Sequence, residues 1–115
     1  MGGIFGRAQS TGTRGHQFVS KVIGYRYALD PRVSKVTFDL GYKRLLGVGG
    51  FKYWPRPDVG VLFKNGTVRI YEVASKTDIT KISLKINNDF MLKNGIQGTT
   101  KVSNIAKFWN SIRPK

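Results

Sequence analysis

The chain has 115 residues, a length that fits one domain. Its 20 Lys and Arg residues against six Asp and Glu residues give a formal net charge of +14, which favours nucleic acid over an acidic protein or a membrane surface as the partner. The absence of cysteine excludes disulfides, Cys-based zinc sites and a Cys nucleophile. No apolar run approaches the roughly 18 residues of a membrane span, and the N-terminus lacks the apolar stretch of a signal peptide.

The N-terminal half is predicted to contain one helix, one strand and a long loop. Residues 1–14 are rich in Gly, Ser and Thr, which predicts a flexible linker or the cut edge of a longer chain. A single domain then covers residues 15–115. An apolar stripe predicts a helix over residues 15–29 that ends at Asp30-Pro31, and alternating apolar residues predict a half-buried strand over residues 33–42.

A segment rich in Gly and Pro, residues 41–57, is predicted to be a loop. Basic and aromatic side chains alternate along it, a composition that suits phosphate contact and base stacking. Packing of the aromatic rings on the core is an equally weighted alternative. The candidate nucleic-acid-binding residues of this loop are Lys43, Arg44, Lys52, Trp54 and Arg56.

Residues 58–74 are predicted to form a β-hairpin with its turn at Lys64-Asn65-Gly66. A two-residue Asn-Gly turn would put Asp58 and Glu72 on opposite faces. A three-residue loop, with Gly66 in the left-handed conformation, would place Asp58 directly opposite Glu72, with Cβ atoms about 5 Å apart. Only the second register brings both carboxylates to one ion.

The C-terminal part is predicted to be helical. A helix that Thr77-Asp78 caps runs to Asn94-Gly95, with Ile82, Ile86 and Phe90 on its apolar face. Residues 96–101 read as a polar loop and residues 102–112 as a further helix. The predicted fold is α+β, close to α/β: a small mixed sheet with a central hairpin flanked by helices.

A pair of facing carboxylates is typical of a site for a hard divalent cation. Asp58 and Glu72 would bind Mg²⁺ or Mn²⁺, with Zn²⁺ also possible. The structural alternatives are that Asp58 caps a turn after Pro57, and that Glu72 is an edge-strand acid paired with Arg69 or Lys76.

The segments R-P-D-V (56–59) and Y-E-V-A-S-K-T-D (71–78) resemble the core of PD-(D/E)xK nucleases. The similarity is closest to the C-terminal toxin domains of bacterial polymorphic toxins of the Rhs and contact-dependent inhibition types. The resemblance implies a restriction-endonuclease-like core: a helix, a sheet whose second and third strands carry the metal carboxylates, and a helix across the sheet. Asp58 matches the Asp of the motif and Glu72 its (D/E), so both would ligate the metal.

Two positions depart from the family pattern. Ala74 stands where the family has its catalytic Lys. Lys76 shares that strand face about 6–7 Å further along and would have to reach back, or Lys52 would substitute. The family's Glu on the first helix is matched here by Gln17. Gln17 can orient a water but adds no charge to the metal site. The alternative is that Gln17 replaces a former Glu and inactivates the enzyme.

The resemblance implies a metal-dependent endonuclease that acts as a toxin by hydrolysing phosphodiester bonds. DNA is the favoured substrate, and RNA, in particular tRNA, is the alternative within the same fold. It also implies an acidic cognate immunity protein, and delivery from a secreted or surface parent protein into the target-cell cytoplasm. The rival class is a non-catalytic basic domain that binds nucleic acid.

Overall fold

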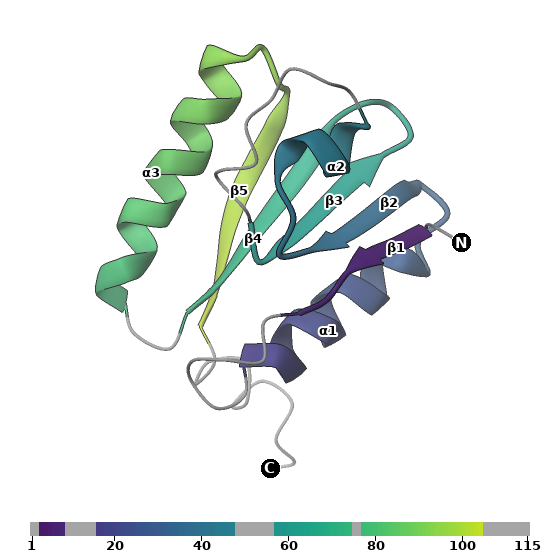
Figure 1. Cartoon of the computed structure of the whole chain (residues 1–115), viewed down its shortest axis with the longest axis horizontal. Coiled ribbons are helices and arrows are strands. Elements are labelled where there is room, and N and C mark those ends of the chain that lie inside the picture. Colours follow the sequence, from purple (N-terminus) through teal and green to yellow (C-terminus); the bar gives the residue numbers. More distant parts are fainter. Residues whose placement is uncertain (1–2, 9–15, 48–56, 75–76, 105–115) are drawn as a thin grey trace.

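The computed structural model describes residues 3–8, 16–47, 57–74 and 77–104. These residues form a five-stranded mixed sheet and three helices (Figure 1). Within them, no helix is both long and apolar enough to cross a membrane. In chain order the elements are β1 (Gly3–Gly6), α1 (His16–Ala28), β2 (Val33–Phe38), α2 (Tyr42–Leu46), β3 (Val59–Phe63), β4 (Val68–Ala74), α3 (Thr77–Lys93) and β5 (Gly98–Asn104).

The strands lie in the order β1-β2-β3-β4-β5, so the β3–β4 hairpin is central. The pairs β2–β3 and β3–β4 are antiparallel, whereas the two edge strands β1 and β5 pair in parallel with β2 and β4. The predicted α+β class, with a mixed sheet around a central hairpin and helices beside it, is confirmed.

Helices cover both faces of the sheet, and each face has its own apolar cluster. On one face, Val19 and Ile23 of α1 pack with strand residues that include Val36, Val59 and Val73. On the other face, α2 and α3 contribute Tyr42, Leu45 and Met91 to a cluster with Val68 and Ile70. Figure 1 shows α2 lying over β3 and α3 running beside β5. Alternate residues of β3 and β4 therefore face different helices.

Three predictions for the N-terminal half are wrong in part. Gly3–Gly6, predicted as part of a flexible linker, forms β1 along the open edge of β2, because strand pairing satisfies backbone groups whatever the composition. The predicted strand over residues 33–42 ends at Phe38. Asp39 takes a positive φ of 51°, which Asp tolerates better than most residues, and Tyr42 begins α2 inside the predicted loop.

The C-terminal prediction is also wrong where the structure describes it. Residues 98–104, predicted as a polar loop and the start of a helix, form β5. Val102 lies opposite Glu72 in the parallel ladder, because the outer edge of β4 needs hydrogen-bond partners that a helix would not supply. The rest of the predicted helix, residues 105–112, lies outside the described residues.

Helix α3 begins at the predicted Thr77 and ends one residue before the predicted Asn94. Its buried face matches the predicted one only in part. Phe90 packs against the cluster of Tyr42 and Met91 as predicted, whereas Ile82 is 64% exposed and Asn87 and Met91 are buried. The buried face also carries a polar side chain, Asn87, into the core.

Candidate functional site

The turn of the β3–β4 hairpin has the three-residue form. The N–H of Phe63 donates to the carbonyl of Thr67 at 2.9 Å, and the N–H of Gly66 donates to the carbonyl of Phe63 at 3.0 Å. Gly66 has a φ of 89°, a left-handed conformation that glycine adopts without a steric penalty. The side chain of Asn65 accepts a hydrogen bond from the N–H of Thr67, which stabilises the turn further.

This turn determines which residues of β3 and β4 face each other. Val61 pairs with Arg69 and Val59 with Tyr71, and the next position in the same register places Asp58 opposite Glu72. Of the two registers that the sequence leaves open, the structure has the three-residue one, and the two-residue alternative is wrong. Both acids lie on the face of the sheet that α2 and α3 cover.

The carboxyl groups of Asp58 and Glu72 interact directly. A hydrogen bond joins them, and Oδ2 of Asp58 also accepts a hydrogen bond from the backbone N–H of Val73 at 2.8 Å. Burial, and next the negative charge of Asp58, raise the pKa of Glu72 from 4.5 to about 8. Glu72 therefore holds a proton through neutral pH unless a cation takes the place of that proton.

A buried polar network orients Glu72 from the helical layer. Nδ2 of Asn87 donates to Oε1 of Glu72 at 2.8 Å, and the hydroxyl of Tyr42 donates to Oδ1 of Asn87 at 2.7 Å. Tyr42 is fully buried and its ring stacks on Phe90 at a centroid distance of 4.6 Å. Burial, and to a lesser extent the charge of Glu72, raise the pKa of Tyr42 well above its usual value.

Sequence reasoning missed both Asn87 and Tyr42 as neighbours of the acidic pair. Tyr42 was assigned to a strand, and its α2 position depends on the turn at Asp39. The available signal was Asn87 itself, because a polar residue on the buried side of a helix needs a hydrogen-bond partner. The sequence did not indicate which partners Asn87 would have, because Asn87 lies 15 residues from Glu72 and 45 from Tyr42.

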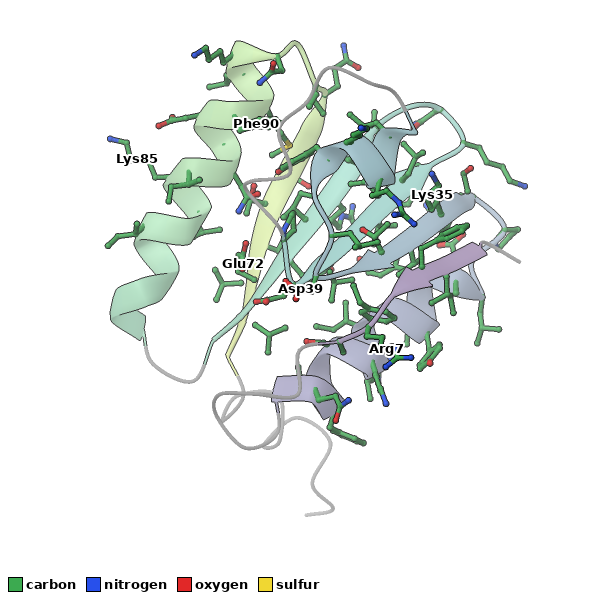
Figure 2. All side chains as sticks on the ribbon, viewed as in Figure 1. Arg7, Lys35, Asp39, Glu72, Lys85 and Phe90 are labelled. Carbon is green, nitrogen blue, oxygen red and sulfur yellow. The ribbon has the colours of Figure 1, made fainter. Side chains whose placement is uncertain are left out.

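The end of β2 lies beside the acidic pair. The N–H of Asp39 donates to the carbonyl of Asp58 at 3.2 Å, and Figure 2 shows Asp39 and Glu72 toward the same end of the sheet. Within the described residues, no group of three or more His, Cys, Asp or Glu side chains is placed to hold a metal. Two carboxylates are nevertheless a sufficient protein contribution for Mg²⁺, which usually keeps several of its waters.

Not all of the other predicted site residues lie near Asp58 and Glu72. Gln17 lies in the first turn of α1 with an exposed side chain, and α1 packs on the opposite face of the sheet. Lys43 and Arg44 are exposed on α2, on the same face as the pair. Lys52, Trp54, Arg56 and Lys76 lie outside the described residues.

One structural alternative for Glu72 is wrong. Arg69, a proposed ion-pair partner, lies on the α1 face, where its Nη1 donates to the hydroxyl of Tyr27 at 2.8 Å. The sheet therefore separates Arg69 from Glu72.

Comparison with protein-family models, with curated proteins and with solved structures finds no match for this chain.

Proposed function

We propose that this chain is a metal-dependent nuclease that hydrolyses phosphodiester bonds. The observation that carries the proposal is the direct opposition of Asp58 and Glu72, with a pKa of about 8 for the partly buried Glu72. Two like-charged groups held together at a partly buried position cost free energy unless a proton or a cation lies between them. Such an arrangement is a recurrent mark of functional sites.

The donor set of the pair fits a hard divalent cation. Asp58 and Glu72 would hold the ion through oxygen, and the ion would supply a nucleophilic water and neutralise charge on the phosphodiester. The hydrogen bond from Asn87 would keep Glu72 oriented, as polar neighbours of metal ligands commonly do. The exposed cations Lys43 and Arg44 on the same face would attract the phosphate backbone.

The order of elements supports the same proposal. Helix α1 precedes strands β2, β3 and β4, with the short α2 between β2 and β3, and α3 follows. Asp58 directly precedes β3 and Glu72 lies on β4. This is the order that the resemblance to PD-(D/E)xK nucleases implies. A role as a polymorphic-toxin domain, an acidic immunity protein, delivery into a target cell, and a preference for DNA over tRNA rest on that resemblance alone.

A non-catalytic basic domain that binds nucleic acid is the second candidate. It is favoured by Ala74 at the end of β4, where the family pattern has its Lys, and by the placement of Gln17 on the far layer. In this case the proton on Glu72 would stay in place and the pair would be structural.

Cleavage assays distinguish the two candidates. The full chain is incubated with plasmid DNA and with total tRNA, without metal and with Mg²⁺, Mn²⁺ or Zn²⁺. We expect metal-dependent cleavage that Asp58→Asn and Glu72→Gln abolish while binding persists, and that Asp89→Asn, an exposed carboxylate on α3, leaves unchanged. Absence of cleavage with every metal, or full cleavage by both site variants, would refute the nuclease.

Calorimetric titration with Mn²⁺ tests the metal site separately from turnover. Since Glu72 must lose its proton to bind a cation, binding should release close to one proton at pH 6.5, and affinity should rise about tenfold per pH unit until pH 8. Binding that is independent of pH, or that Glu72→Gln leaves intact, would place the metal elsewhere.

A further inference from the structure

A hollow lies on the α1 face, near the turn of the same hairpin. It has a volume of about 500 Å³ and is lined by three basic residues, Arg32, Lys64 and Arg69, together with Phe63 and Thr67. No carboxylate lines it among the described residues. Asp30 forms an ion pair with Arg32 at 2.7 Å and offsets one of the three positive charges.

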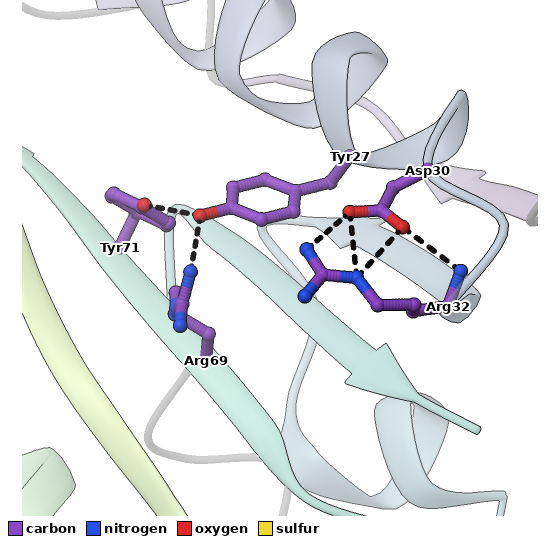
Figure 3. A network of polar contacts seen from close by, with 5 residues as sticks. All are labelled: Tyr27, Asp30, Arg32, Arg69 and Tyr71. Carbon is purple, nitrogen blue, oxygen red and sulfur yellow. Dashed lines mark hydrogen bonds and ion pairs between the residues drawn. The ribbon is translucent and has the colours of Figure 1, made fainter. Parts of the chain in front are cut away.

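Arg69 is held in a defined orientation at this pocket. Its guanidinium lies against two rings, 5.7 Å from the centroid of Tyr27 and 5.4 Å from that of Phe63. Nη1 donates to the hydroxyl of Tyr27, which in turn is 2.6 Å from the hydroxyl of Tyr71 (Figure 3). In the described structure, Nε of Arg69 is buried without a hydrogen-bond partner.

The two loops that carry the other cations are joined to each other. The N–H of Lys64 donates to the carbonyl of Arg32 at 2.8 Å, and Val33 pairs with Phe63 across the β2–β3 ladder. The hydrogen bonds from Arg32 to Asp30 hold the guanidinium of Arg32 on the same face of the sheet as Tyr27 and Arg69 (Figure 3). The cationic wall is thus formed before any ligand binds, which lowers the entropic cost of binding.

We propose that this pocket binds a phosphate group. A fixed guanidinium is suited to a phosphate because its N–H groups can donate to two oxygens at once. The volume exceeds that of a phosphate alone and leaves room for the sugar that carries it. The phosphate can come from a polynucleotide backbone or from a terminal or free phosphate, since the recognised chemistry is the same.

The pocket is separate from the acidic pair. Asp58 and Phe63 stand at opposite ends of one strand, about 17 Å apart, and Arg69 lies on the face of the sheet opposite to Glu72. The pocket therefore serves binding and not hydrolysis, and the inference stands whether or not the chain proves to be a nuclease.

NMR titration of the metal-free full chain tests the pocket directly. The probes are inorganic phosphate, a thymidine trinucleotide with a 5′-phosphate, the same trinucleotide without it, and hexaglutamate. We expect phosphate to shift the Nε–H resonance of Arg69 and the amides of Asn65 to Thr67. A stronger effect of the 5′-phosphorylated trinucleotide indicates a terminal phosphate, and equal effects of both indicate a backbone phosphate.

Charge-matched variants separate this pocket from general attraction to a basic protein. Arg69→Gln and Lys64→Gln should each weaken phosphate binding about tenfold, whereas Lys85→Gln on α3 should leave it unchanged. Lys64 is exposed, so its variant decides the matter if Arg69→Gln fails to fold. Equal weakening by all three variants, or pocket shifts with hexaglutamate and none with phosphate, would overturn the proposal; the second result would indicate an acidic protein.

Discussion

Asn87 donates a hydrogen bond to Glu72 at 2.8 Å, so a residue of α3 orients a carboxyl group that the hairpin presents. The same amide accepts a hydrogen bond from Tyr42 of α2. The candidate site is therefore a product of three elements, and its chemistry depends on how α2 and α3 pack on one face of the sheet.

The stability of the fold should fall as pH rises through the neutral range. The pKa of Glu72 is about 8 in the fold against 4.5 ordinarily, so between these values the folded chain keeps a proton that the unfolded chain has released. The stabilising contribution of this proton is complete below pH 4.5 and is lost by about pH 8. Between these values the free energy of unfolding falls by at most ~1.4 kcal/mol per pH unit.

Urea unfolding at pH 5, 6, 7 and 8 measures this slope. We expect Glu72→Gln to flatten it, because an amide does not titrate, and Asp89→Asn to leave it in place. A wild-type chain whose unfolding free energy rises over this interval would contradict the assignment of the proton to Glu72.

Removal of the Asn87 amide should have a structural and an electrostatic effect. Asn87→Leu leaves the buried hydroxyl of Tyr42 without this acceptor, at a cost of about 1–3 kcal/mol. It also removes a hydrogen bond that lowers the pKa of Glu72, so that pKa should rise above 8. Urea unfolding gives the first quantity, and carboxyl NMR titration gives the second.

A double-mutant cycle isolates the contact itself. Tyr42→Phe combined with Asn87→Leu should cost less than the sum of the single changes, and Asn88→Ala, on the exposed side of α3, should leave the pKa of Glu72 unchanged. Strict additivity of Tyr42→Phe and Asn87→Leu would mean that the hydrogen bond contributes little to the network.

Gly60 is required by close packing between β2, β3 and α2. A Cβ at this position would lie 2.6 Å from Oγ1 of Thr37 and 3.0 Å from Cδ2 of Leu45. Gly60→Ala should therefore cost about 1–3 kcal/mol, measured by urea unfolding. Because Gly60 shares the face of Asp58, the same change should also weaken metal binding.

A second substitution tests whether the clash with Thr37 causes the loss of stability in Gly60→Ala. Thr37→Ala removes the atom nearest to the new methyl group, so the double variant should be more stable than Gly60→Ala alone. Gly66→Asn is the control, because nothing lies within 4 Å of a Cβ there and Asn tolerates positive φ. A Gly60→Ala variant as stable as the wild type would contradict the close approach.

Local patterns were enough to predict the hairpin and to limit its register to two alternatives. Alternation places Asp58, Gly60, Ile70 and Glu72 on one face, and Gly66 is suited to the left-handed position of a three-residue loop. These properties depend on a few neighbouring residues, so the sequence could give the opposition of the two acids as one of two registers, and the structure chose between them.

Only the tertiary structure decided the remainder. Strands β1 and β5 form because the edges of the sheet offer hydrogen-bond partners, and neither Gly3–Gly6 nor Gly98–Asn104 shows a strong local strand pattern. The positive φ of Asp39 ends β2 early and allows Tyr42 to enter α2. The contacts of Asn87 with Glu72 and Tyr42, and of Arg69 with Tyr27, join residues far apart in the chain, so they follow from packing and from the need to satisfy buried polar groups.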